Sequence, residues 1–229
     1  MIARVRNDEF IAKEVFDSMY WDSRVDASKV SVKVDNGIVT LSGTVPSYSS
    51  RAAASEDAWL ITGVRDVENQ LKVDFRTTVP SDEEIASNIQ DQFRWDNDLY
   101  PYDIQVTVLT GWVTLEGTVD AFWKKVRAED LAFSMRGVLG LTNKIAVVPT
   151  QTVTDENLAE DIINALDRNV NVNVDDINVT VEEGTVTLTG AVPSWSSKRA
   201  AYDSARYTLG VKEVKDQITV TLPEETFEG

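Results

Sequence analysis

The chain has 229 residues, of which 42% are hydrophobic and 26% charged, a balance typical of soluble globular proteins rather than disordered ones. It contains no Cys and no His, which excludes disulfides, Cys-based metal sites, catalytic triads and Cys/His dyads. With 22 basic and 38 acidic residues, its formal net charge is −16. A field of that sign repels phosphates, so we expect no nucleic acid partner.

One glycine-flanked segment occurs three times along the chain. Residues 37–43 (GIVTLSG) recur as residues 111–117 (GWVTLEG) and 184–190 (GTVTLTG), at offsets of 74 and 73 residues. A second landmark, a Gly-Val pair, recurs at the same offsets and begins at Gly63, Gly137 and Gly210. Two sequence landmarks at the same spacing indicate three homologous repeats.

The repeat boundaries follow from two short linkers, TTVP at 77–80 and VPTQ at 148–151. We therefore expect three domains, and we expect the acidic end of the third to be frayed. The predicted domains are 1–76, 77–150 and 151–229.

Each repeat opens with a predicted helix. Asn7, Ser81 and Thr154 are suitable N-cap residues, and Ser81 with Glu84 has the spacing of a capping box. Apolar residues spaced about one turn apart predict one buried face on each helix. They are Ile11, Val15 and Met19, then Ile85, Ile89 and Phe93, then Leu158, Ile162 and Leu166.

A predicted hairpin follows the first helix of each repeat. Two alternating apolar runs are separated by Asn36-Gly37 or its equivalents, and Asn-Gly is the preferred pair of a type I′ turn. The predicted strand pairs are 30–34 with 38–41, 104–108 with 113–115, and 177–181 with 186–188.

A second helix and a last strand complete each repeat. Alanine-rich segments around Ala53, Ala128 and Ala201 predict a helix with a small-residue face that approaches a sheet closely. Gly63, Gly137 and Gly210 fit the C′ position that ends this helix. The last strands are predicted over residues 64–73, 138–147 and 211–220. The fold class is therefore α+β, with three tandem αββαβ domains and two helices on one face of each three-stranded sheet.

The pattern G-x-V-T-L-x-G-x-V, followed about 20 residues later by G-V-x-x-V/L-x-N/D-x-I/L, resembles the BON domain. The three closing segments begin at Gly63, Gly137 and Gly210, and together the copies cover nearly the whole chain. Its plan resembles that of multi-domain OsmY-like osmotically inducible bacterial proteins. The resemblance implies mixed sheets, no enzymatic activity, and binding to phospholipid surfaces or other polypeptides in osmotic or envelope stress.

Three hypotheses about function stay open at this stage. A lipid-surface module predicts exposed aromatic rings beside basic residues, whereas a polypeptide-binding or scaffold protein predicts an exposed apolar groove or an unpaired sheet edge. An enzyme predicts convergent carboxylates in a deep cleft. We favour a non-enzymatic phospholipid-binding stress-protection module, with no catalytic residues, cofactor or metal, and with polypeptide binding as the alternative. The sequence does not indicate the oligomeric state.

The candidate contact surface lies at the start of the second helices. Aromatic residues stand at one equivalent position in all three repeats, and basic residues follow them directly, a composition typical of membrane-interface contacts. The alternative is a hydrophobic staple that only fixes the entry of the chain into the helix. The predicted residues are Tyr48, Arg51, Phe122, Trp123, Lys124, Lys125, Trp195, Lys198 and Arg199.

Other motifs have plain structural interpretations. Repeated glycines suit turns and close packing, and Gly137–Gly140 matches a KH-type GxxG only formally. Acidic residues at 82–84 and 155–156 favour helix dipoles, and no EF-hand spacing supports calcium. Trp21 and Trp95 are expected to cover the end of a core or to pack one domain on the next.

Targeting signals are weak. Residues 1–10 (MIARVRNDEF) contain no apolar segment typical of a secretory signal, and no stretch of 18 apolar residues predicts a transmembrane helix. We therefore expect a cytoplasmic protein, with the periplasm as the alternative that the family resemblance suggests.

Overall fold

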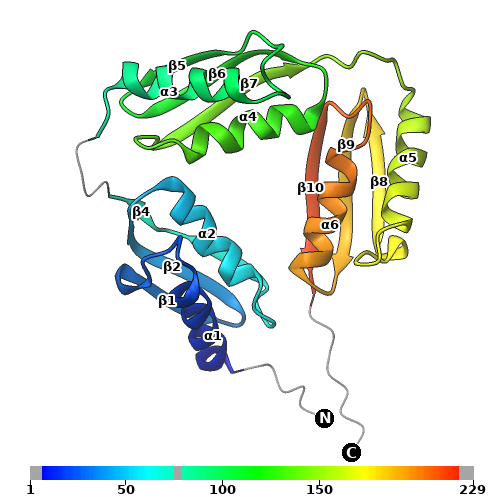
Figure 1. The fold of residues 1–229 in the computed structure, drawn as a ribbon. Helices are drawn as coiled ribbons and strands as arrows, with labels where there is room; N and C mark the ends of the chain where they lie inside the picture. The colour runs from blue at the N-terminus through cyan, green and yellow to red at the C-terminus, as the bar shows by residue number, and fades with distance from the viewer. Residues whose placement is uncertain (1–6, 75–78, 222–229) are drawn as a thin grey trace, which may run out of the picture. The chain divides into compact units, whose positions relative to one another are not determined.

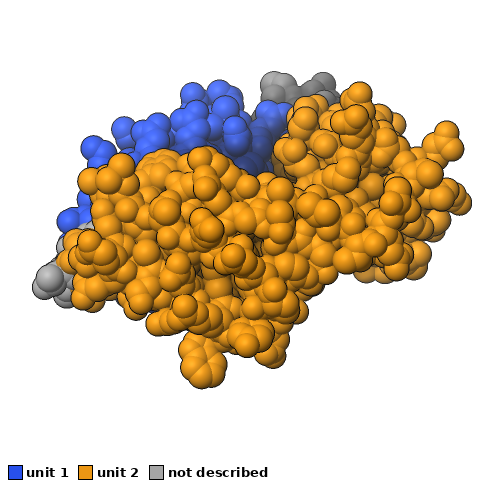
Figure 2. All heavy atoms as spheres, turned by 90° about the horizontal axis from the view of Figure 1, so that it is seen from above, with its two compact units in different colours: residues 1–77, 193–196, 220–229 blue, residues 78–192, 197–219 orange. Residues whose placement is uncertain are grey.

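The computed structural model describes residues 7–74 and 79–221, and its elements are shown in Figure 1. The predicted acidic tail at 223–229 lies outside the described residues. The chain forms two compact units, shown in Figure 2. One unit comprises residues 1–77, 193–196 and 220–229. The other comprises residues 78–192 and 197–219.

All three repeats contain the predicted order of helix, hairpin, helix and strand (Figure 1). The first has α1 (Asp8–Trp21), η1 (Ala27–Lys29), β1 (Val30–Asp35), β2 (Ile38–Val45), α2 (Tyr48–Trp59), β3 (Asp66–Asn69) and β4 (Lys72–Val73). The second has α3 (Asp82–Trp95), β5 (Gln105–Leu109), β6 (Trp112–Val119), α4 (Phe122–Ser134) and β7 (Gly140–Val147). The third has α5 (Asp155–Asp167), η2 (Val174–Asp176), β8 (Ile177–Glu182), β9 (Thr185–Val192), α6 (Trp195–Arg206) and β10 (Glu213–Val220).

Each sheet is mixed, with the second hairpin strand in the centre. β6 pairs with β5 antiparallel and with β7 parallel, and β2 pairs with β1 antiparallel and with β3 and β4 parallel. The third sheet has the order β10-β9-β8. Two helices pack against one face of each sheet (Figure 1), so the α+β class is confirmed.

The cores confirm the predicted helix faces. Ile85, Ile89 and Phe93 of α3 are buried, as are the equivalent residues of α1 and α5. Ser81 and Glu84 form the predicted capping box, in which each side chain accepts a hydrogen bond from the other residue's backbone N–H. Buried alanines on α2, α4 and α6 bring these helices close to the sheets: Ala53, Ala54, Ala58, Ala128, Ala132, Ala201 and Ala205.

The predicted C′ role of three glycines is wrong. Gly63, Gly137 and Gly210 have positive φ angles of 105°, 96° and 96°, but they lie three or four residues beyond the last helical residue. They stand in the turn into the last strand, where space is short. A Cβ at Gly137 would lie 2.6 Å from Ile85 Cδ1, so the glycine lets this turn approach α3.

The strand lengths also differ from the prediction. The central strands extend to Val45, Val119 and Val192, beyond the predicted ends at residues 41, 115 and 188. The last strand of the first repeat is interrupted and forms β3 and β4, whereas β7 and β10 each start two residues later than expected. The interruption in the first repeat falls between Asn69 and Lys72.

Candidate functional site

The predicted contact residues lie where expected in the fold but are not all exposed. Tyr48, Phe122 and Trp195 are the first residues of α2, α4 and α6. Phe122 is only 7% exposed, and Tyr48 and Trp195 are half-buried. The expectation that Phe122 is exposed is therefore wrong, because a ring of this size gains more by packing inward. Its burial favours the staple interpretation for the second repeat.

Two of the predicted basic residues fasten their own helix to the last strand. Arg51 Nη2 donates to the Asn69 carbonyl oxygen at 2.9 Å. At the equivalent position, Lys198 Nζ donates to the Ile218 carbonyl oxygen at 2.7 Å and lies 3.5 Å from Asp216 Oδ2. Both cations already interact with oxygen atoms of their own repeat, which makes Arg51 and Lys198 less available to an external ligand.

A polar side chain of the last strand also joins that strand to the second helix. It belongs to Asn69, Asn143 or Asp216, each two residues before a buried core residue. Asn143 Nδ2 donates to the Lys125 carbonyl oxygen and to Glu129 Oε2, both at 3.0 Å, and Asn143 Oδ1 accepts from Ile145 N at 3.1 Å. In the first repeat, Asn69 makes the equivalent bonds to Arg51 and Leu71. The interaction therefore recurs where the last strand meets the second helix.

Lys124 is also held within its repeat. Its Nζ lies 2.8 Å from Asp120 Oδ1 and 2.9 Å from Tyr102 Oη. Burial alone would lower the pKa of Lys124, but the hydrogen bonds with Asp120 and Tyr102 outweigh it and raise the pKa. Lys124 also lies 5.5 Å from the centre of the Trp123 ring. The structure thus brings Trp123 and Lys124 together, with the positive charge already neutralised by Asp120.

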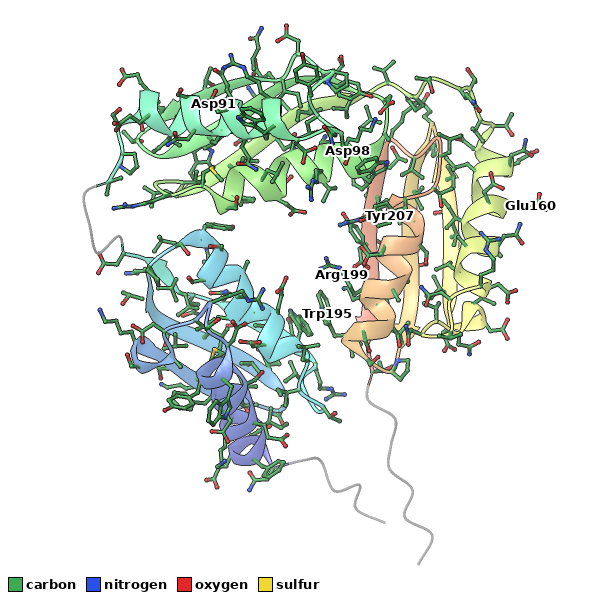
Figure 3. The ribbon with its side chains drawn as sticks, viewed as in Figure 1. Asp91, Asp98, Glu160, Trp195, Arg199 and Tyr207 are labelled. Atoms are coloured by element: carbon green, nitrogen blue, oxygen red, sulfur yellow. The ribbon has the colours of Figure 1, made fainter. Side chains whose placement is uncertain are left out.

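The remaining predicted residues are more open. Trp123 is half-buried, and its ring lies 6.3 Å from that of Tyr207, both within the second compact unit. Arg199 is exposed and pairs with Asp203 at 3.3 Å. Figure 3 shows Trp195, Arg199 and Tyr207 on the same side of α6 and the turn that follows it. Only part of the predicted surface is therefore accessible.

Exposed aromatic rings lie instead at the ends of the first helices. Trp21 and Trp95 are the last residues of α1 and α3, and they are 83% and 85% exposed. They occupy equivalent positions 74 residues apart, where the third repeat has Arg168. The expectation that these rings cover a core is wrong. The offset between the two copies is the signal that could have identified them as a repeated surface feature.

Trp21 belongs to an aromatic cluster on α1. The Tyr20 ring contacts Trp21 edge-on at 5.3 Å, and the Phe16 ring lies 6.5 Å from Tyr20. An open groove of about 470 Å³ adjoins Trp21 and is lined by residues of α1 and of the segment after α2. Its lining comprises Glu14, Asp17, Ser18, Trp21, Leu60, Ile61 and Thr62.

A metal site and a membrane-spanning helix each require a defined set of residues. Within residues 7–74 and 79–221, no three acidic side chains gather as a metal site would require. No helix in that part of the chain has the length and apolar character needed to cross a bilayer.

The family model described as the BON domain matches residues 7–74, 81–149 and 154–221. The chain belongs to the BON domain family. Its three BON domains thus account for nearly every described residue, and each match contains one complete αββαβ repeat.

The BON chain is similar to Osmotically-inducible protein Y of Escherichia coli (strain K12), with 28% identity over 149 residues. That alignment covers 63% of this chain and 74% of the relative. Among solved structures it is similar to CdsD, a structural protein of the Type III secretion system of Chlamydia trachomatis, with 13% identity, 93% of each chain covered and a TM-score of 0.28. The C-terminal domain of CdsD matches with 14% identity, 92% of this chain and 96% of that chain covered, and a TM-score of 0.26.

Proposed function

We propose that this BON protein is a non-enzymatic binding module that contacts phospholipid surfaces during osmotic stress. The observation that carries the proposal is the pair Trp21 and Trp95, which are 83% and 85% exposed at equivalent positions of two domains. The stress role is supported by the similarity to Osmotically-inducible protein Y. The absence of His and Cys from the sequence supports a role other than catalysis.

Exposed indoles suit a bilayer interface better than water. Tryptophan has a large apolar body and one N–H donor, and it is enriched at the headgroup level of membranes for this reason. A ring at a helix end can enter the interface without any change in the fold behind it. Two such rings on separate BON domains give two weak contacts, and linked contacts bind more tightly together than either does alone.

Charge determines which lipids are expected. The net charge of −16 opposes approach to anionic headgroups, and salt screens this repulsion beyond about 8 Å at physiological ionic strength. Binding through Trp21 and Trp95 is therefore expected to be stronger on zwitterionic than on anionic vesicles at low salt. Added salt is expected to reduce the difference.

The surface predicted at the second helices stays a proposal for an additional contact. Trp123 is its most suitable member, because Phe122 is buried and Lys124 is paired with Asp120. A Trp123→Ala variant tests this contact, and a loss of vesicle binding in that variant would support it. The Trp21 and Trp95 contact is tested separately.

The test is co-sedimentation of the full chain with phosphatidylcholine vesicles and with vesicles containing phosphatidylglycerol, at low and near-physiological salt. We expect the Trp21→Ala/Trp95→Ala variant to lose at least about tenfold in vesicle affinity. Trp112→Ala is the matched control, since it removes another exposed indole and is expected to bind vesicles like the wild type. No binding of the wild type to either vesicle would contradict the proposal.

A further inference from the structure

The second BON domain has an apolar patch at the tip of its hairpin. Leu109, Trp112 and Leu139 are 74%, 52% and 46% exposed. Leu109 pairs with Trp112 in the β5–β6 register, and Leu139 N donates to the Gly111 carbonyl oxygen at 2.8 Å. Leu109 and Trp112 are therefore cross-strand neighbours, and the Leu139 side chain lies beside the turn at Gly111; we call these three residues the hairpin patch.

The hairpin patch is held in place by its surroundings. The Trp112 ring lies over Gly140, where an added Cβ would approach Trp112 Cζ3 to 2.3 Å. The indole Nε1 donates to Thr142 Oγ1 at 3.0 Å, and the Leu139 side chain lies against Gly111. Side chains held in this way lose less conformational entropy when they bind a partner, which favours a specific contact.

The other two domains carry polar or charged residues at the equivalent positions, with the exception of Ile38 in the first domain. The turn itself does not require apolar residues, because all three turns have the same positive φ angles, near 50° and 78°. The geometry of the turn therefore does not depend on the patch. Leu109, Trp112 and Leu139 correspond to Asp35, Ile38 and Arg65 in the first domain and to Glu182, Thr185 and Lys212 in the third.

The charges beside the hairpin patch indicate the kind of partner. Asp82 lies at the turn, with its carboxylate 2.6 Å from Thr110 N, and the exposed Glu83 and Glu84 follow it in the first turn of α3. An apolar patch with an acidic neighbour complements a partner that carries apolar and basic side chains. A second copy of this chain, with a net charge of −16, is a poor match.

We propose that the hairpin patch is a docking site for a polypeptide segment whose apolar side chains are flanked by Lys or Arg. The patch occurs in one domain only, unlike the repeated Trp21 and Trp95. It is therefore suited to one defined partner segment rather than to an extended, repetitive surface. Leu109, Trp112 and Leu139 provide the apolar contact, while Asp82 and Glu83 attract the basic residues.

The test uses two fluorescent 15-residue peptides with identical Leu and Phe positions, one flanked by lysines and the other by glutamates. Anisotropy titration with the full chain is expected to show saturable binding of the Lys peptide and at least tenfold weaker binding of the Glu peptide. The Leu109→Glu/Leu139→Lys variant introduces the pair that the third domain carries, so it is expected to fold. It should bind the Lys peptide at least tenfold more weakly. Trp112→Thr, which copies Thr185, is a second variant with the same expected loss.

The Trp21→Ala/Trp95→Ala variant is the control and should bind the Lys peptide like the wild type. The proposal is overturned if the Lys peptide does not bind saturably, if Leu109→Glu/Leu139→Lys binds it normally, or if the Glu peptide binds equally well. The proposal would also be overturned if sedimentation velocity showed a wild-type dimer that Leu109→Glu/Leu139→Lys abolishes, since a second copy of the chain would then occupy the patch. Vesicle binding depends on other residues, so either proposal can fail while the other stands.

Discussion

Asp82 Oδ1 accepts a hydrogen bond from the backbone N–H of Gly111 at 2.9 Å. The other carboxylate oxygen accepts from Thr110 N at 2.6 Å, so one side chain in the first turn of α3 satisfies both central amides of the hairpin turn. The same arrangement joins the first helix to the hairpin in the other two domains. There the carboxylates are Asp8 and Asp155, and the amides belong to Asn36, Gly37, Glu183 and Gly184.

We expect Asp82→Ala to lower the free energy of unfolding of the second domain by about 2–3 kcal/mol, because two charge-assisted hydrogen bonds are lost. Urea unfolding of the full chain measures the loss, and NMR hydrogen exchange at Thr110 and Gly111 locates it. Glu83→Ala removes a neighbouring carboxylate and is the control. Unchanged exchange at both turn amides in Asp82→Ala would contradict the role assigned to this residue.

Asn143 connects α4 to β7 through both ends of its amide. Asn143→Leu keeps the size of the side chain but removes the acceptor of the Ile145 amide and the donor to Lys125 and Glu129, so a loss of about 2–3 kcal/mol is expected. Asn143→Asp combined with Glu129→Tyr should cost less, because the third domain combines Asp216 with Lys198 and Tyr202 at the positions of Asn143, Lys125 and Glu129. Equal losses in the two variants, measured by urea unfolding, would rule out this explanation.

Most of the fold could be predicted because the same order of helices and strands is indicated separately by each of the three repeats. The hairpin turns are an example: Thr110 and Glu183 adopt positive φ of 50° and 52° like Asn36, although neither has its intrinsic preference. Here the repeat register carried more information than local propensity. Strand order could not be predicted, since the parallel pairing of β6 with β7 depends on how α4 crosses the sheet.

The candidate surface was harder to predict, because composition does not tell which side of a helix faces the sheet. Phe122 and Trp123 are adjacent in sequence, yet Phe122 is buried and Trp123 is half-buried. Likewise, the sequence predicts Lys124 as a contact residue because it follows an aromatic residue, but its ammonium group is bound by Asp120 and Tyr102 within the domain. Only the three-dimensional arrangement shows that such charges are already paired.

Gly190→Ala is expected to destabilise the third domain more than Gly140→Ala destabilises the second. Gly190 has φ of 135°, and a Cβ there would lie 2.1 Å from the Asp176 carbonyl oxygen, so the backbone itself must move. At Gly140 the obstacle is the Trp112 side chain, whose displacement costs its packing and its hydrogen bond to Thr142 but leaves the backbone in place. Urea unfolding of both variants checks the order, and a larger loss for Gly140→Ala would show that the Trp112 ring is less free to move than we infer.

Asp57 of α2 provides a prediction with a defined pH dependence. Its side chain is 6% exposed, and burial, reinforced by repulsion from Asp22, raises the pKa of this carboxyl above its ordinary value. Ionisation is therefore penalised in the folded state, so stability contributed by Asp57 falls as pH rises through the ordinary pKa and then the raised one. Below the ordinary pKa of about 4, the group is protonated in both states and the penalty vanishes.

We therefore expect Asp57→Asn to raise the free energy of unfolding of the first domain by about 1 kcal/mol at pH 7, with the gain lost below about pH 4. The other domains support a neutral residue at this position, since they have Leu131 and Ser204 there. Urea unfolding between pH 3 and pH 8 gives the profile, and Glu68→Gln, which removes an exposed charge, serves as the control. A gain that is independent of pH would show that Asp57 affects stability through packing, because only a penalised charge makes the gain grow as pH rises.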